Sequence, residues 1–270
     1  MRTLTSLGTL AFALVLGTQA AAQVTHNVQV GPNFDFIPAD VSIQVGDTVK
    51  WTWAGTFFHN VESGVGSVPD GIFSSGAPFA GAGHTFSVTF DAAFLAAHPV
   101  TNNNYDYYCI VHEALFGMSG VVRVTTPYGC TAPAGSMKNV NSDGPHVNQV
   151  WQVAVNNPVP GGQTPGSLAF VGIATAPAPG FPCGLALPGF HMDPAQPLGE
   201  LLISISPPNP LVTLGPLPWV GPGTPTTFGV PVPNNPGLVG IELYLQGLII
   251  DPVGPHTFGA AAGLRATIGA

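Results

Sequence analysis

The feature that most constrains this chain is a set of short runs in which every second residue is apolar, each run being bounded by turn-forming residues. Such alternation predicts strands with one face in a core and the other toward solvent. Clusters of Gly, Pro, Asn and Asp separate the runs at 31–33, 64–71 and 76–83. The first half is therefore expected to form an antiparallel β-sandwich. The apolar runs are Val41-Ile43-Val45, Val49-Trp51-Trp53 and Phe86-Val88-Phe90.

The composition is compatible with the same fold class. The chain has 35 glycines and 29 prolines, a content close to that of disordered proteins. However, 45% of the residues are hydrophobic and only 7% are charged, which favours packed β-structure with many turns. The segment Asp91 to His98 is the one candidate for a short helix, with a long loop as the alternative.

The first 22 residues are typical of a secretory signal peptide. Arg2 is followed by an uncharged apolar run from Leu7 to Leu16 and then by Ala20-Ala21-Ala22. This run is too short to span a bilayer, and no later stretch reaches the required length of about 20 apolar residues. We expect a mature protein that begins near Gln23 and is secreted, to the periplasm or to the extracellular side of the cell envelope.

The length of 270 residues suggests more than one domain. We predict a first domain at 23–126, a linker at 127–135 and a second domain at 136–270. The fold class is all-β, with a Greek-key sandwich followed by a second sandwich-like domain. Strands of the second domain are expected at Val150–Val155, Leu168–Ile173, Leu201–Ile205 and Leu238–Ile250.

The charge is acidic, with 13 acidic against 5 basic residues and a formal net charge of −8. Nucleic acid is therefore an unsuitable partner. The acids are concentrated in 23–126, so a partner with a basic surface is one interpretation. The alternative is that these charges only keep the domain soluble.

The three cysteines are an odd number for an oxidising compartment. Cys130 and Cys183 both lie in the second half and are the candidates for a disulfide. Cys109 then remains as a free thiol, and the alternation from Tyr105 to Cys109 directs it into the domain.

Four residues form a candidate metal site, namely His59, Cys109, His112 and Met118. Two imidazoles, one thiolate and a weak axial thioether are the ligands associated with electron-transfer copper. Zinc is less suited, because a thioether is a poor zinc ligand. Taken singly, each ligand has an ordinary structural explanation, for instance as a buried apolar Cys or Met.

The segment 24–126 resembles the plastocyanin and amicyanin branch of the cupredoxins. By this resemblance, His59 is the upstream ligand, Cys109 the thiolate, His112 the second imidazole and Met118 the axial ligand, with one type 1 copper per chain. Asn60 would connect the two ligand loops, and His112 would be the electron port, with Leu115 and Phe116 as an apolar rim. The matching motifs are Phe34 to Pro38, Val45-Gly46-Asp47-Thr48-Val49-Lys50-Trp51, His59-Asn60-Val61, Tyr107-Tyr108-Cys109-Ile110-Val111-His112 and Gly117-Met118-Ser119-Gly120-Val121-Val122.

The chain departs from this pattern at two places. Five residues separate His112 from Met118, where a plastocyanin has four. The segment Asp91 to Asn104 is also longer than in a compact cupredoxin and is a candidate extra flap.

The function expected from this resemblance is outer-sphere transfer of single electrons between redox proteins. Four protein ligands leave no open position for a substrate, so we expect no enzymatic activity. A copper oxidase or nitrite reductase is disfavoured because Tyr108 and Ile110 flank Cys109, where such oxidases carry His-Cys-His. The alternatives are a copper-binding or copper-delivery protein and a structural protein of the envelope.

The remaining histidines are not assigned to a metal, because none has neighbours of matching ligand spacing; this includes the weak pattern His191-Met192-Asp193. They are His26, His84, His98, His146, His191 and His256. The second half shows no catalytic pattern. Its stretch from Val230 to Asp251 resembles a β-rich C-terminal module of secreted bacterial proteins, which implies an accessory role.

Overall fold

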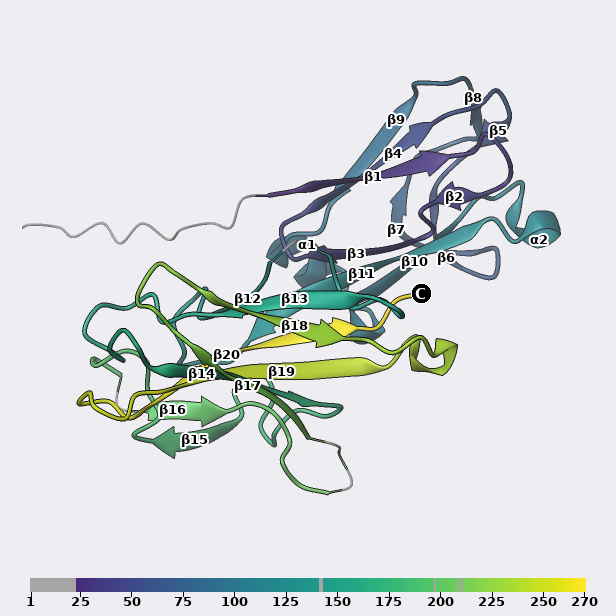
Figure 1. Ribbon diagram of the computed structural model, residues 1–270. Coiled ribbons are helices and arrows are strands. Elements are labelled where there is room, and N and C mark those ends of the chain that lie inside the picture. Colours follow the sequence, from purple (N-terminus) through teal and green to yellow (C-terminus); the bar gives the residue numbers. More distant parts are fainter. Residues whose placement is uncertain (1–22, 141–142, 197, 208, 210) are drawn as a thin grey trace, which may run out of the picture.

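The computed structural model describes residues 23–140, 143–196, 198–207, 209 and 211–270. The predicted signal peptide at 1–22 lies outside the described residues. Nearly all of the regular secondary structure in the described chain is strand, which confirms the predicted all-β class (Figure 1). No helix in these ranges has the length and apolar character needed to cross a membrane.

One sheet of the first half follows the predicted alternation. The expected antiparallel arrangement holds only in part: β4 lies antiparallel to β9, but β1 lies parallel to β4 and β3 lies parallel to β11. Val49 and Trp51 of β4 are fully buried, and Trp53 is 1% exposed. The strands, in sheet order, are β2 (Phe36–Ile37), β1 (Thr25–Val30), β4 (Thr48–Trp53) and β9 (Thr85–Thr89).

The facing sheet carries the segment with the predicted thiolate. Trp51 of the first sheet meets Tyr107 of the second edge to face, with ring centroids 5.3 Å apart, so the aromatic core lies between the sheets. The strands are β3 (Asp40–Gln44), β6 (Glu62–Val65), β7 (Val68–Ser74), β10 (Asn104–Tyr108) and β11 (Ser119–Tyr128). A short ladder of β5 (Phe58–His59) and β8 (Phe79–Ala80) lies at one end.

The predicted short helix at 91–98 is confirmed as α1 (Ala92–Ala97). It forms because the Asp91 carboxylate accepts a hydrogen bond from the Phe94 N–H and so caps the first turn. A 3-10 turn, η1 (Thr101–Asn103), leads from it to β10.

The core of the second half contains Trp151 and Trp219 and lies between a separate three-stranded sheet and four strands that continue the sheet of β11. The predicted strand at Val150–Val155 is confirmed. The three-stranded sheet consists of β12 (Met137–Asn139), β13 (Val150–Val155) and β18 (Thr226–Pro231). The four facing strands are, in sheet order, β17 (Val212–Pro218), β14 (Leu168–Ala174), β19 (Glu242–Ile250) and β20 (Phe258–Thr267). A separate hairpin joins β15 (Leu185–Pro188) to β16 (Leu198–Leu201).

Two predicted strands of this half have different bounds in the structure. The strand expected from Leu238 begins at Glu242, because Asn235 caps the 3-10 turn η2 (Pro236–Leu238). The strand expected at Leu201–Ile205 is shifted to β16, and Ile203 makes only an isolated bridge with Pro177.

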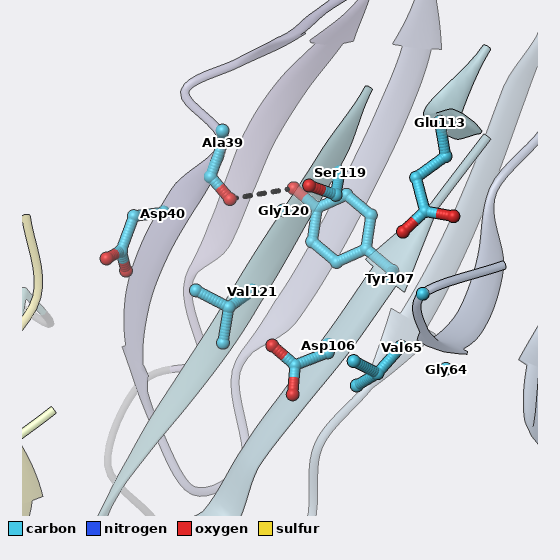
Figure 2. Close-up of a pocket in the computed structure, with 11 residues that line it drawn as sticks. Ala39, Asp40, Gly64, Val65, Asp106, Tyr107, Glu113, Ser119, Gly120 and Val121 are labelled. Carbon is cyan, nitrogen blue, oxygen red and sulfur yellow. Dashed lines mark hydrogen bonds between the residues drawn. The ribbon is translucent and has the colours of Figure 1, made fainter. Parts of the chain in front are cut away.

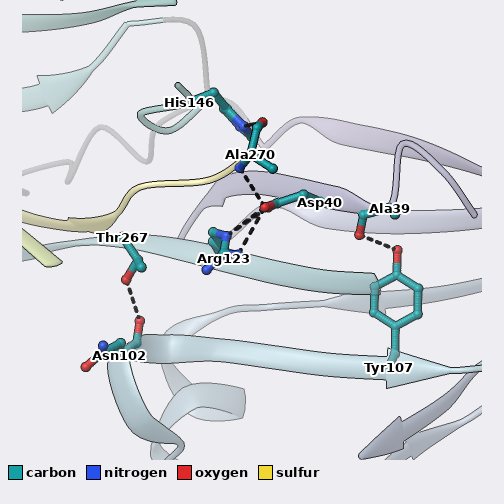
Figure 3. A network of polar contacts seen from close by, with 8 residues as sticks. All are labelled: Ala39, Asp40, Asn102, Tyr107, Arg123, His146, Thr267 and Ala270. Atoms are coloured by element: carbon teal, nitrogen blue, oxygen red, sulfur yellow. Dashed lines mark hydrogen bonds and ion pairs between the residues drawn. The ribbon is translucent and has the colours of Figure 1, made fainter. Parts of the chain in front are cut away.

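Strand β11 connects the two halves. It pairs with β10 up to Arg123, with β3 up to Thr125 and with β20 from Thr126 to Tyr128. The strand therefore continues through the boundary expected from the sequence at 126/127. Polar contacts reinforce the junction: Arg123 binds Asp40 at 2.8 Å, Asp40 accepts from the Ala270 N–H, and Thr267 donates to the Asn102 carbonyl (Figure 3).

The predicted disulfide between Cys130 and Cys183 is present, with Cα atoms 5.0 Å apart. Cys109 is the free and buried cysteine.

Candidate metal centre

His59 is held at the end of β5 by its main chain. The Trp53 indole donates a hydrogen bond to the His59 carbonyl at 3.1 Å, and the side chain is fully buried. Gly31 lies against the imidazole, and a Cβ at this position would lie 3.1 Å from Nε2. Since Nε2 is enclosed and has no hydrogen-bond partner, Nδ1 is the nitrogen that remains for a ligand.

The downstream residues lie on one tight loop. The Cys109 carbonyl accepts hydrogen bonds from the N–H groups of His112 and Glu113, and this starts the single helical turn α2 (Glu113–Phe116). Gly117 ends the turn at a φ of 68°, a left-handed conformation that glycine adopts at little cost. The Cys109 N–H then donates to the Met118 carbonyl at 3.0 Å, which closes the loop. The five residues that separate His112 from Met118 are thus the helical turn α2 and Gly117.

Three donor atoms converge between these two segments. His59 Nδ1 lies 3.1 Å from His112 Nδ1 and 3.9 Å from Cys109 Sγ, and His112 Nδ1 lies 3.4 Å from the same sulfur. Ligands bound to one ion through bonds of about 2.0 Å to nitrogen and 2.3 Å to sulfur are separated by similar distances. This donor set therefore fits a single soft or borderline metal ion.

Both imidazoles are electrostatically suited to act as neutral ligands. Burial lowers the pKa of His59, and a positive charge on the facing His112 would lower it further, while Asp35 opposes this in part. Burial also lowers the pKa of His112. Metal binding requires deprotonated imidazole nitrogen, so both shifts favour it.

Met118 is 1% exposed and belongs to the same buried cluster as Cys109. This places the thioether residue on the core side of the loop, whereas His112 is only half-buried. The loop therefore holds one candidate ligand, Met118, in the core and another, His112, partly exposed to solvent.

Asn60 joins the two segments. Its side-chain oxygen Oδ1 accepts a hydrogen bond from the Ile110 N–H at 2.9 Å, and its side-chain Nδ2 donates to the Gly76 carbonyl at 3.3 Å. The residue is fully buried. The segment after His59 and the segment after Cys109 are therefore fastened to each other beside the sulfur.

An aromatic surface surrounds His112. The Phe34 ring lies 4.5 Å from the His112 ring and stacks on Phe116 at 4.1 Å. Leu115 is 80% exposed and Phe116 is 54% exposed. Phe34 and the close approach of Gly31 were not predicted as parts of the site. Phe34 begins the Phe34 to Pro38 motif, but nothing in a local pattern shows that its ring reaches His112.

Carboxylates lie on the neighbouring face of β10 and β11. Figure 2 shows a shallow pocket on this face with Asp40, Asp106 and Glu113 at its edges. Burial raises the pKa of Tyr108, and the nearby charges of Glu62, Glu113 and Asp70 raise it further. This face is therefore negatively charged close to the metal centre.

Another group of potential ligands within the described residues consists of Cys130, Cys183 and Glu200. It does not fit a metal, because the two sulfurs are bonded to each other. The Glu200 carboxylate instead accepts hydrogen bonds from the N–H groups of Cys130 and Thr131.

Comparison with known proteins gives consistent matches. A family model described as copper binding proteins of the plastocyanin/azurin family matches residues 22–125, the range that contains all four predicted ligands. A chloroplastic plastocyanin from Tetradesmus obliquus is 32% identical over 120 residues, which are 42% of this chain and 72% of the relative.

Similar solved structures include two cupredoxins. A purple cupredoxin from Nitrosopumilus maritimus is 26% identical, with a TM-score of 0.29 and coverage of 36% of this chain and 97% of that chain. A mutant plastocyanin of a fern is 21% identical, with a TM-score of 0.28 and coverage of 37% and 99%.

Proposed function

Because the chain belongs to the plastocyanin/azurin family of copper-binding proteins, we propose that it carries single electrons between redox partners, using one type 1 copper ion held by His59, Cys109, His112 and Met118. The observation that carries this proposal is the convergence of two Nδ1 atoms and one Sγ atom at separations of 3.1–3.9 Å. When bound, copper supplies a reversible one-electron change between Cu(I) and Cu(II).

The residues of the chain serve this role by holding one geometry. Soft sulfur from Cys109 suits the reduced ion, and the imidazoles suit both oxidation states. The hydrogen bond from Trp53 to the His59 carbonyl and the bond from Ile110 to Asn60 restrain the two ligand segments. Outer residues that hold the ligands in one geometry keep the reorganisation energy between the two oxidation states small. A small reorganisation energy allows fast electron transfer.

His112 is the proposed electron port. It is half-buried, whereas His59, Cys109 and Met118 are at most 1% exposed. Leu115 and Phe116 provide an apolar contact surface beside it. The negative face with Asp106 and Glu113 favours a partner whose docking surface is basic.

We further propose that the protein acts outside the cytoplasm, as the predicted signal peptide and the disulfide between Cys130 and Cys183 suggest. The residues 136–270 are assigned an accessory role. Polar contacts such as that between Thr267 and Asn102 support attachment of this part to the copper-binding domain. We assign no catalytic activity to the protein.

The visible spectrum of the copper-loaded protein tests the proposal. Protein without residues 1–22 is expected to turn intensely blue when Cu(II) is added, because a thiolate ligand to Cu(II) is part of the proposed site. Cys109→Ser is expected to abolish the colour while circular dichroism shows the same β-fold. A colourless wild-type protein that nonetheless binds copper would exclude a type 1 site.

Voltammetry separates electron transfer from copper delivery. An electron carrier is expected to give a fast and reversible one-electron couple, and copper should remain bound in both states. Release of copper on reduction would instead support delivery.

A further inference from the structure

Two histidines of the second half meet although 65 residues separate them in the sequence. His191 Nε2 lies 3.1 Å from His256 Nδ1, and the ring centroids are 4.8 Å apart. The same distance of 3.1 Å separates the two imidazole nitrogens of the proposed copper site. Neither residue was predicted as a ligand, because no local spacing connects them.

A buried amide network fixes both histidine backbones. The Gln163 amide donates to the His191 carbonyl at 3.2 Å and to the His256 carbonyl at 3.3 Å. The Asn157 amide donates to Gln163 Oε1 and to the Met192 carbonyl, both at 2.8 Å. Asn157 is fully buried and Gln163 is 3% exposed. Asn157 and Gln163 are thus themselves held by hydrogen bonds, and they pre-organise the pair.

The surroundings determine which atoms are available to a ligand. His191 Nδ1 is buried and has no hydrogen-bond partner, so a ligand can approach this ring only through Nε2, the atom that faces His256. Both histidines are half-buried, which leaves the pair within reach of solvent.

The charge of this half also suits a cation. From 139 to 264 the sequence contains no Lys or Arg, whereas Asp193 follows His191 by two positions. The basic residues that flank this range are Lys138 and Arg265, and Arg265 is paired with Glu242.

We infer that His191 and His256 form a second metal site, which takes a late divalent transition-metal ion such as Ni²⁺, Zn²⁺ or Cu²⁺. Imidazole nitrogen suits these ions, whereas Ca²⁺ and Mg²⁺ require oxygen ligands. Among the described residues, no third His, Cys, Asp or Glu completes a cluster around the pair. Water therefore fills the remaining coordination positions, and the bound ion is exchangeable.

Equilibrium dialysis against Ni²⁺ tests this inference with the full mature chain, after addition of one equivalent of copper. Wild-type protein is expected to bind one Ni²⁺ that His191→Gln and His256→Gln each weaken by at least tenfold. His146→Gln is the matched control in the same half and should retain the wild-type affinity. If the copper proposal failed, the added equivalent of copper would itself compete at the pair, so the dialysis is repeated without copper. A loss of Ni²⁺ binding in His191→Gln and His256→Gln but not in His146→Gln would then still be due to the pair.

A second measurement uses the unaltered protein and so avoids variants that misfold. Substoichiometric Cu²⁺ added after the first equivalent should selectively broaden the ring resonances of His191 and His256 in an NMR spectrum. Absence of saturable Ni²⁺ binding would overturn the inference, and so would equal loss in His146→Gln. In either case the contact would be only a hydrogen bond between two imidazoles.

Discussion

The Ile110 N–H donates a hydrogen bond to Asn60 Oδ1 at 2.9 Å, and this bond crosses between the segments that carry His59 and Cys109. The two segments are 50 residues apart in sequence. Their ligands therefore depend on a contact that neither segment can make by itself.

Asn60→Ala is expected to weaken copper binding by about 10- to 100-fold, as is common when a residue that orients a metal ligand is removed. It leaves the Ile110 N–H unpaired, which costs roughly 1–3 kcal/mol of stability. Copper titration and urea unfolding measure the two effects. Asn234→Ala, an exposed change in the second half, is the control, and equal affinities in both variants would contradict the role of Asn60.

Gly31→Ala tests the close packing of the His59 ring. Gly31 has a φ of 73°, and Gly66 has a φ of 61° with open space where a Cβ would lie. Alanine should therefore cost about 1–2 kcal/mol at either position because of the left-handed backbone. Only Gly31→Ala should also displace the imidazole and alter the copper spectrum. The same spectral change in Gly66→Ala would show that the ring contact is unimportant.

The acidic face predicts opposite salt dependence for reagents of opposite charge. Oxidation or reduction of the copper-loaded protein by a cationic complex such as hexaammineruthenium should slow roughly tenfold as salt rises. The rate with anionic hexacyanoferrate should increase. Stopped-flow absorbance gives both rates.

Asp106→Asn with Glu113→Gln should flatten both salt dependences, because both carboxylates line the pocket on this face and Glu113 directly follows His112. Asp143→Asn, an exposed change in the second half, should leave them unchanged. Equal slopes for the two reagents would show that the face does not steer encounter.

The sequence was most informative where a property is local. Alternation at Val49, Trp51 and Trp53 predicted which side chains are buried, and the short apolar segment after Asp91 predicted a helix. The all-β class followed from the same alternation and the frequent turns. Spacing and family resemblance also singled out Cys109 and His112, whose donor atoms lie 3.4 Å apart in the structure.

Properties that depend on long-range packing were not accessible in this way. The contact of the Phe34 ring with His112 and the contact of His191 with His256 arise from loops that only the tertiary fold brings together. The continuation of β11 to Tyr128 was also missed, since its pairing partner β20 lies at the far end of the chain. Turn residues such as Pro127 suggested a linker at this position.

Removal of the disulfide should destabilise the second half without affecting the copper site. The bond closes a loop with a sequence separation of 53, so loss of the cross-link is expected to cost about 4 kcal/mol. Urea unfolding of the double variant Cys130→Ala, Cys183→Ala measures this. The blue colour should persist, because Cys109 is the free cysteine. Loss of the colour in the folded variant would contradict the conclusion that the copper site does not depend on the disulfide.

Asp251 makes the stability of the second half depend on acid. Burial alone would raise the pKa of its carboxyl, but hydrogen bonds from Thr164, Val253 and Gly254 outweigh this and lower the pKa to about 2. In the unfolded chain the group has an ordinary pKa of about 4. The folded protein therefore binds the proton more weakly, and the stabilisation is fully present above pH 4 and lost as the pH falls toward 2.

Asp251→Asn is accordingly expected to lower the free energy of unfolding by roughly 2 kcal/mol at pH 7, since it removes hydrogen bonds to a charged acceptor. The difference from wild type should shrink between pH 4 and pH 2, where the wild-type carboxylate becomes protonated. Urea unfolding at several pH values measures this difference, with exposed Asp143→Asn as the control. Because Asp251 shapes the loop that carries His256, the variant should also weaken Ni²⁺ binding. A difference in stability that stays constant down to pH 2 would contradict the lowered pKa.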